Sequence, residues 1–536
     1  MSYILYLILP FWGLHILRRS LFWLYFWQLK EYRFDRFFDG IRANKRILFP
    51  VVSIFSFLLV VFSPLFSKIE FSFGRYYLTG FEVLVFLLYL FFGLYSFVLL
   101  FKKAWALPKF TFKMVFLFVF TIAMIGILFF EINPSLEISI FALSAVVFEI
   151  FFIPFILLSA GIFQVPIFFA KKWIIRRAKE KMKRLKNLTV IGITGSYGKT
   201  STKEFLAQIL SLKYKVLKTK GNTNTEIGVA NTVLKDLTSD YQVFICEMAA
   251  YKKGEIKAIC DIVHPKIGIL TGISQQHISL FGTLKNIINT KYELIESLPP
   301  EGIAIFNGAN KECLKLSKRC NLKKKIYSIP EGDVFATNIY ESKDFVEFDM
   351  IVEKKKERIR LNLLGKQNIE NFLGAVACAL ELGISLSQIK KIAPKIKGSD
   401  ILMQKKKGKN GAIIIDDSYS QNPDGVLMAI DYLKNYKRKK VIVMPCLIEL
   451  GRSSPSIHKK IGEEIGKTCD LAIITTGYYF EELKIGAMSE GMKKDQILFL
   501  DKTNKILEKL KPYLKRGNVI LIEGRVPKKL IKEITT

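Results

Sequence analysis

The sequence predicts an α-helical transmembrane domain followed by two α/β domains, and three observations lead to this prediction. The 536-residue chain is too long for a single core and suggests two to four domains. Phe, Leu, Ile and Val dominate residues 1–170. From residue 188 onward, short β-branched runs alternate with amphipathic stretches, which is the pattern of parallel sheets covered on both faces by helices.

Four long apolar stretches predict membrane-spanning helices. Each reaches the ~20 residues that a helix needs to cross the hydrocarbon core of a bilayer. They are Ile47–Phe66, Tyr76–Phe101, Phe110–Phe130 and Ile138–Ala170. An earlier segment, Tyr3–Leu29, is interrupted by Arg18 and Arg19, so it can span, tilt or lie in the interface. It lacks the basic start and the small-residue cleavage site of a signal peptide.

The distribution of basic residues between the loops predicts an orientation. Residues 30–46 carry six basic residues and residues 102–113 carry four, whereas residues 67–75 carry two and residues 131–137 carry none. This alternation follows the positive-inside rule and places the later half of the chain on the cytoplasmic side. We therefore predict a multi-pass protein of the cell (inner) membrane with cytoplasmic catalytic domains and with membrane lipids as partners.

Charge and cysteine content narrow the possible functions. A formal net charge of +33 would suit nucleic-acid binding, but the basic residues cluster beside the apolar segments, where they set topology and meet anionic lipid. No zinc-finger spacing or RNA-recognition motif is present, so we expect no nucleic-acid partner. Seven cysteines, all in the later half and without a C-x-x-C pair, indicate buried thiols of a reducing compartment.

The later half reads as alternating strands and helices. Amphipathic helices are expected at Ser201–Leu212 and Asn371–Leu382. Strands are expected at Leu188–Thr194, Gln242–Cys246, Ile267–Leu270, Ile303–Phe306, Ala412–Ile415, Val441–Met444, Leu471–Thr475 and Val519–Ile522.

Four segments follow from these patterns. The transmembrane domain is expected at residues 1–172, and a basic linker with the character of an interfacial helix at 173–187. The two α/β domains are expected at 188–396 and 397–536, joined at the glycine- and lysine-rich stretch Lys395–Gly411.

The strongest local signal is the run GITGSYGKTS, which starts at Gly192. A predicted strand ends and a helix begins within it, so backbone N–H groups and the helix N-terminus can surround phosphate oxygens. Lys199 supplies charge and Thr200 a hydroxyl that can face magnesium. The strict P-loop spacing fails because residue 193 is Ile, but the shorter form G-x-x-G-K-[ST] is met. The expected ATP-binding residues of this run are Thr194, Gly195, Ser196, Tyr197, Gly198, Lys199, Thr200 and Ser201.

Three further polar residues each have two interpretations. Glu247 closes a predicted strand at the carboxyl edge of the sheet, where a carboxylate can hold magnesium or merely cap a helix. His277 can be a metal ligand or a structural histidine. Lys291 can be functional or an ordinary surface lysine. The residues alone leave these alternatives open.

Seven separated blocks occur in the order and spacing seen in the Mur ligases, a family of ATP-dependent amide-bond ligases. The blocks are TGSYGKTS, GNTNTEIGV, EMAAYKKGEI, HISLFGTLKNIINTKYE, GKQNIENFLGAVACAL, DDSYSQNPDG and LIELG, within about residues 188–530. The chain most resembles the members that add D-alanyl-D-alanine in peptidoglycan synthesis, since the DNPR-type signature of the diamino-acid-adding branch is absent. The resemblance implies a central ATP-binding domain and a Rossmann-like C-terminal domain.

The resemblance also implies roles for individual residues. Thr200 and Glu247 match magnesium ligands, and His277 matches the histidine at a second metal. Lys291 matches a lysine that is carbamylated to bridge the metal site, and Asn371 matches a residue near adenine. The expected catalytic set is Lys199, Glu247, His277 and Lys291. The residues expected to meet substrate or close over it are Asn222, Asn224, Asp417, Tyr419 and Asn422.

The chain departs from the family pattern at several positions. Gln367 stands where His is common, Ala249 where Gly is usual and Ala309 where Asp is common, and residues 523–525 replace a Lys-Gly-Ser run. The largest departure is at the N-terminus, where relatives have a domain that grips the UDP part of the substrate.

Three functions remain under consideration. In the first, ATP phosphorylates the carboxylate of a muramyl tripeptide, and D-alanyl-D-alanine attacks the acyl phosphate. In the second, the same chemistry acts on a lipid-linked or other carboxylate. In the third, the chain is a membrane transporter or regulator with a nucleotide switch, although a switch needs neither Lys291 nor the block at 416–423. The expected cofactors are ATP and Mg²⁺, with Lys291 carbamylated.

Overall fold

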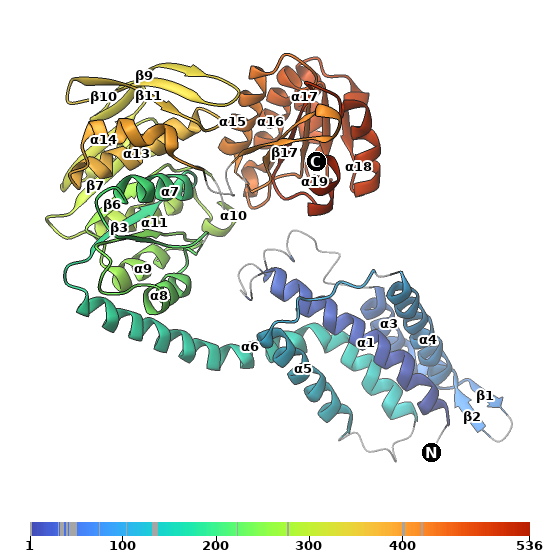
Figure 1. Cartoon of the computed structure of the whole chain (residues 1–536). Helices are drawn as coiled ribbons and strands as arrows, with labels where there is room; N and C mark the ends of the chain where they lie inside the picture. The colour runs from blue at the N-terminus through green and yellow to red at the C-terminus, as the bar shows by residue number, and fades with distance from the viewer. Residues whose placement is uncertain are drawn as a thin grey trace. The chain divides into compact units, whose positions relative to one another are not determined.

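The computed structural model falls into two compact units, Met1–Lys171 and Lys172–Thr536, which are described one at a time (Figure 1). The structure describes residues 3–30, 32, 37–38, 41, 51–73, 76–102, 104–130, 138–221, 223–275, 278–398, 403–419 and 422–536.

The first unit is built from helices. They are α1 (Tyr3–Leu29), α3 (Val51–Phe66), α4 (Gly80–Phe101), α5 (Phe112–Phe130) and the beginning of α6 (Ile138–Arg184), with a hairpin of β1 (Glu70–Phe73) and β2 (Tyr76–Thr79). A capping box fixes the start of α4, because Thr79 accepts a hydrogen bond from the backbone N–H of Glu82 while the Glu82 carboxylate accepts one from that of Thr79. Aromatic side chains, among them Trp23, Trp27 and Phe37, form the core of this unit.

The expectation of a multi-pass membrane protein is wrong. Among the residues that the structure describes, one helix, α4, is long and apolar enough to cross a membrane, and Met114–Ala123 within α5 is a shorter apolar stretch. Over the described residues, α3 has 16 residues, fewer than the ~20 that a span needs, and α1 carries Arg18 and Arg19 near its middle. The predicted localisation as a multi-pass protein of the cell membrane is therefore wrong. The prediction of membrane lipids as partners is not supported.

Of the loops that set the predicted orientation, most of 30–46 and all of 131–137 lie outside the described residues. The basic segment 173–187 is helical to Arg184, as the end of α6. It packs on the central domain through Ala178 and Met182, and Lys181 Nζ donates a hydrogen bond to the carbonyl of Leu234 at 3.0 Å.

The central domain has a nine-stranded sheet in the order β11-β10-β9-β8-β7-β6-β3-β5-β4. The six strands from β4 to β8 in this order are parallel, and the start of β9 also pairs in parallel with β8. Strand β10 is antiparallel to both β9 and β11, so these three strands form an antiparallel extension. The strands are β3 (Thr189–Thr194), β4 (Val216–Lys218), β5 (Val243–Glu247), β6 (Ile267–Leu270), β7 (Ile303–Asn307), β8 (Lys323–Ser328), β9 (Val334–Glu341), β10 (Val346–Val352) and β11 (Lys355–Leu361).

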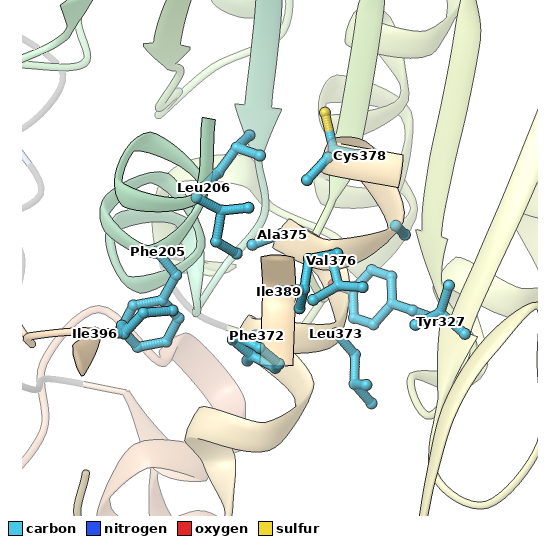
Figure 2. Close-up of a cluster of buried hydrophobic side chains, with 14 of the residues drawn as sticks. Phe205, Leu206, Tyr327, Phe372, Leu373, Ala375, Val376, Cys378, Ile389 and Ile396 are labelled. Atoms are coloured by element: carbon cyan, nitrogen blue, oxygen red, sulfur yellow. The ribbon is translucent and has the colours of Figure 1, made fainter. Parts of the chain in front are cut away.

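Helices cover both faces of this sheet (Figure 1). They are α7 (Lys199–Leu210), α8 (Glu226–Lys235), α9 (Glu255–Val263), α10 (Ile278–Phe281), α11 (Leu284–Glu296), α12 (Lys311–Arg319), α13 (Gln367–Glu381) and α14 (Leu386–Ile392). On one face, Phe205 and Leu206 of α7 pack with Phe372 and Ala375 of α13, as Figure 2 shows. This apolar contact holds two helices whose first residues meet the phosphate loop.

The C-terminal domain has a six-stranded sheet in the order β12-β13-β17-β14-β15-β16. All neighbours are parallel except β12 and β13. The strands are β12 (Gln404–Lys407), β13 (Ile413–Asp417), β14 (Lys440–Met444), β15 (Leu471–Ile474), β16 (Ile497–Phe499) and β17 (Val519–Glu523). The helices are α15 (Pro423–Tyr432), α16 (Ser454–Thr468), α17 (Phe480–Ser489), α18 (Thr503–Leu510) and α19 (Lys528–Ile534).

The prediction of two α/β domains is confirmed. All eight predicted strands are present, each within two residues of its expected ends. All seven cysteines are buried and free, as expected. The exact domain boundaries at 172, 187 and 396 stay predictions.

Candidate active site

A cleft of about 400 Å³ gathers most of the predicted site residues. Of the seventeen residues predicted, fourteen line it: Gly195, Ser196, Tyr197, Gly198, Lys199, Thr200, Ser201, Asn224, Glu247, Lys291, Asn371, Asp417, Tyr419 and Asn422. Thr194 lies behind the loop, where its buried hydroxyl donates to the carbonyl of Met248 at 2.9 Å. Asn222 and His277 lie outside the described residues.

The phosphate loop joins the end of β3 to the start of α7. Gly198 is the N-cap of α7 and has a φ of 78°, a conformation that side-chain-bearing residues rarely adopt. A Cβ atom at this position would also overlap Oδ1 of Asn371, the fifth residue of α13. Thr271, just after β6, donates to the carbonyls of Thr194 and Tyr197. Glycine is therefore required where the loop turns against Asn371.

Lys199 lies folded onto its own loop. Its Nζ atom donates to the carbonyl of Gly195 at 2.8 Å and to that of Ser196 at 3.2 Å. Burial lowers the pKa of this ammonium, and the negative charge of Glu247 works in the opposite direction. The Lys199 ammonium therefore lies on the phosphate loop, next to the N-terminus of α7, which favours anions.

Glu247 is almost fully buried at the end of β5, and its carboxylate is held by three side chains. Oε2 accepts from the Thr200 hydroxyl at 3.0 Å and from the Lys203 ammonium at 2.9 Å. Oε1 accepts from Asn224 Nδ2 at 2.9 Å. The backbone N–H of Glu247 donates to the Thr219 hydroxyl at 3.1 Å. The pure helix-cap interpretation of Glu247 fails, because its carboxylate faces the cleft beside the phosphate loop.

These residues suit a magnesium ion. A carboxylate and a hydroxyl oxygen lie together beside a phosphate-binding loop, and oxygen atoms are the ligands that Mg²⁺ prefers. Within the described part of the chain, no group of three or more His, Cys, Asp or Glu residues could hold a metal. Mg²⁺ usually completes its shell with waters and substrate phosphates, so two protein ligands are sufficient here.

Lys291 is buried in α11, with 5% of its surface exposed, and lines the cleft. The ordinary surface-lysine interpretation is therefore wrong. Burial lowers the pKa of its ammonium to about 7, and the positive charge of Lys199 adds to the effect. Glu255 and Glu293 partly oppose it. At neutral pH, a large fraction of this amine is uncharged.

A polar network that the sequence did not indicate joins α13 to the neighbouring strands. Asn307, at the end of β7, donates to Glu370 Oε2 at 2.9 Å and to the carbonyl of Thr271 at 2.8 Å. Asn310 donates to the Tyr197 hydroxyl at 3.1 Å. Burial raises the pKa of Glu370, which lines the cleft next to Asn371. Asn307 and Asn310 belong to no motif and are marked only by their places after β7 and at the start of α12, whereas Glu370 and Tyr197 lie within two of the seven blocks.

The C-terminal domain closes the cleft with residues that follow β13. Asp417 pairs in register with Glu523 of the parallel strand β17. Burial raises the pKa of Asp417 to about 7, its contact with Glu523 offsets part of this rise, and the charge of Asp416 adds to it. Asn422 Oδ1 accepts from the N–H of Gly425 at 2.8 Å and caps α15, while Tyr419 is half exposed.

Three of the departures from the family pattern reach the cleft. Gln367, Ala249 and Arg525 line it. Ala309 donates its backbone N–H to Asn307 Oδ1 at 2.9 Å and so supports the network around Glu370.

Comparison with known proteins identifies two family domains in this chain. The family described as "Mur ligase middle domain" matches residues 193–379, and "Mur ligase, glutamate ligase domain" matches residues 403–526. The UDP-N-acetylmuramoyl-tripeptide–D-alanyl-D-alanine ligase of Buchnera aphidicola is 30% identical over 341 residues, which cover 63% of this chain and 72% of the relative. The enzyme of the same name from Synechocystis is 32% identical over 287 residues, 52% of this chain and 59% of the relative.

A crystal structure of MurF from Acinetobacter baumannii superposes with a TM-score of 0.63 at 26% sequence identity, over 68% of this chain and 80% of that one. The chain belongs to the Mur ligase family. It spans about three fifths of the length of relatives such as those from Synechocystis and Escherichia coli.

Proposed function

We propose that this chain is an ATP-dependent amide-bond ligase that joins D-alanyl-D-alanine to a muramyl tripeptide. One observation carries the proposal: a single cleft brings together the phosphate loop, the Thr200–Glu247 pair and the buried Lys291. The named relatives support the choice of substrates, since each is called a UDP-N-acetylmuramoyl-tripeptide–D-alanyl-D-alanine ligase.

The reaction has two covalent steps. A carboxylate oxygen of the tripeptide attacks the γ-phosphorus of ATP, the bond to the β-phosphate oxygen breaks, and an acyl phosphate and ADP result. The amine of D-alanyl-D-alanine then attacks the acyl carbon, inorganic phosphate leaves with its bridging oxygen, and the amine nitrogen gives up its proton. When bound, Mg²⁺ would neutralise negative charge on the ATP phosphates.

The residues of the chain bind and orient the reactants. The backbone N–H groups of the phosphate loop hold the ATP phosphates, and Lys199 exchanges its two carbonyl partners for phosphate oxygens. Thr200 and Glu247 would hold the metal. Asn371 lies against the loop at Gly198, where it can reach the nucleotide. Residues after β13 cover the cleft and keep water from the acyl phosphate.

A carbamate on Lys291 is part of this proposal. The neutral amine nitrogen attacks CO₂, a C–N bond forms, one C=O π bond of CO₂ breaks and one proton leaves the nitrogen, so a neutral side chain becomes an anion. Starting from the ammonium form, two protons leave in all. The lowered pKa of Lys291 favours this reaction, because the neutral amine is the reactive form. An anion at this position would add an oxygen donor near Lys199 and the phosphate loop, where a second cation can bind.

A phosphate-release assay with the purified chain tests the function. ATP, Mg²⁺ and D-alanyl-D-alanine are supplied with either a UDP-linked or a lipid-linked muramyl tripeptide. We expect release with the UDP-linked substrate, dependent on both organic substrates, and an amide product by mass spectrometry. Release only with the lipid-linked substrate would favour the same chemistry on a lipid-linked carboxylate. Release with neither would overturn the proposal.

A further inference from the structure

Lys203 is a fully buried lysine on α7, one helical turn after Lys199. Its Nζ atom donates to Glu247 Oε2 at 2.9 Å and to the carbonyl of Gly221 at 2.7 Å. A second carboxylate, that of Glu204, lies 3.8 Å away. The ammonium therefore joins three parts of the central domain: the phosphate helix, the end of β5 and the segment that follows β4.

The energetic cost of this arrangement indicates a purpose beyond stability. Removing an ammonium and a carboxylate from water costs several kcal/mol per ion, and their mutual attraction often does no better than apolar packing of the same size. A leucine or methionine would fill the same position but would leave the Glu247 carboxylate buried without its cation. What the lysine adds is a defined position for the groups that it bonds.

We propose that Lys203 is a positioning residue that sets the Glu247 carboxylate for its metal and ties it to the segment 219–225. Oε2 of Glu247 is shared by Lys203 and Thr200, while Oε1 is held by Asn224. Both carboxylate oxygens are thereby fixed in one orientation before a metal enters.

The segment 219–225 is bonded to this carboxylate region at four points. Thr219 accepts from the Glu247 N–H, and Gly221 accepts from Lys203. Asn224 donates to Glu247 through its side chain and accepts from the Ala249 N–H, at 2.9 Å each. The metal ligand and a segment that lines the cleft therefore move as one unit, with Lys203 as its buried link to α7.

Two substitutions test this role. Lys203→Met removes the charge and both hydrogen bonds at similar length, and Lys203→Gln keeps a neutral donor. Lys218→Met is the matched control. Lys218, the last residue of β4, is partly exposed and pairs with Glu204 of α7 without touching Glu247. The measured quantity is the dissociation constant of ADP with and without Mg²⁺, since its ratio isolates the metal's contribution.

We expect the Mg²⁺-dependent gain in ADP affinity to fall roughly 10- to 100-fold in Lys203→Met, as is typical when a residue that orients a metal ligand is lost. Lys203→Gln should lie between this variant and the wild type, and Lys218→Met should match the wild type. An unchanged gain in Lys203→Met would overturn the proposal. So would an increased gain, because it would make Lys203 a competitor of the metal rather than its support.

The inference rests on the proposed function only for the identity of the metal. A measurement without metal therefore tests the role of Lys203 separately from the proposed function. Hydrogen–deuterium exchange of the apo protein should accelerate at 219–225 and 247–250 in both Lys203 variants and stay unchanged in Lys218→Met. If ADP binding shows no Mg²⁺ dependence in the wild type, the proposed function fails and the exchange result alone decides the role of Lys203. Equal exchange in all variants would refute the role.

Discussion

Lys291 concentrates the chemistry of the cleft in one side chain. It is buried in α11, close enough to Lys199 for that positive charge to help lower its pKa to about 7. Two ammonium groups in one buried cleft repel each other, and converting one to a carbamate would relieve this repulsion while adding a metal ligand. The surroundings of Lys291 therefore agree with the carbamate proposed above.

We expect Lys291→Ala to lose most of its phosphate-release activity. The variant cannot form the proposed carbamate, and no other described side chain supplies an anion at this position. Small carboxylates such as acetate or formate, added to the assay, should restore part of the activity by occupying the space that the side chain leaves. Phosphate release over a concentration series of each acid gives the measurement. Full activity of the untreated variant would remove the carbamate from the account.

Asp417 gives the domain a defined pH response. Burial raises its folded pKa to about 7, whereas an unfolded aspartate titrates near 3.9. Between these values the native state holds a proton that the unfolded state has released. The stability that this group contributes is thus fully present below about pH 3.9 and is lost as the pH rises through about 7.

Asp417→Asn should flatten this response. The free energy of unfolding should fall less steeply between about pH 4 and 7, by up to about 1.4 kcal/mol per pH unit. Urea unfolding at several pH values measures the slope. Asp240→Asn is the control, because a hydrogen bond from Lys215 holds the pKa of Asp240 at about 2 and confines its effect to lower pH. Equal slopes in the wild type and Asp417→Asn would contradict the assignment.

The sequence predicted cleft residues only where they belong to a recognisable motif. Lys199, Thr200 and Glu247 belong to blocks with a mechanism, and the structure brings them together. Lys203 was missed because a buried lysine and a surface lysine look the same in a helical pattern. Glu370 was missed because its role comes from Asn307, which is far away in the sequence.

At the scale of elements, continuous apolar strands were predictable and polar ones were not. Strand β6 (IGIL) and β15 (LAII) are buried on both faces and read as short apolar runs. In contrast, β8 (KKKIYS) begins with exposed lysines and ends buried, and β11 (KKERIRL) alternates buried and exposed positions only toward its end. Both strands are dense in charge. Their strand character comes from pairing with neighbours, which a local pattern does not contain.

The contact between α7 and α13 should carry much of the stability of the central domain. Phe372 is fully buried in one cluster with Phe205 and Leu206 of α7 (Figure 2). Its ring centroid lies 6.2 Å from that of Phe348 on β10. We expect Phe372→Ala to lower the free energy of unfolding by about 3–5 kcal/mol. Denaturant unfolding of the purified chain measures this loss.

Tyr340→Ala on β9 provides the comparison, because its side chain is 57% exposed. It should change stability by about 0.5 kcal/mol. Phe372→Ala should also weaken nucleotide binding, since Asn371 precedes it and lies against the phosphate loop. A loss below about 1 kcal/mol in Phe372→Ala would show that α13 is not fixed by this core.

At the scale of the whole molecule, the two units differed in how far composition was informative. In Lys172–Thr536, the order of seven blocks specified both domains, because each block is tied to a turn or strand end of one fold. In Met1–Lys171, apolar content predicted helices correctly but overestimated the number of membrane spans. Apolar composition alone does not give the number of membrane-spanning helices. Helix ends and internal arginines shorten the continuous apolar length of each helix, and a short helix does not reach across a bilayer.

All fourteen cleft-lining site residues belong to the second unit, so nucleotide binding is the property on which the whole account depends. Isothermal titration calorimetry of the intact chain with a non-hydrolysable ATP analogue tests it most directly. We predict one binding site that requires Mg²⁺, and an affinity roughly 10- to 100-fold weaker in Lys199→Ala, the loss of a charge-assisted hydrogen bond worth about 1.5–3 kcal/mol. Absence of binding in the wild type, or unchanged affinity in Lys199→Ala, would contradict it.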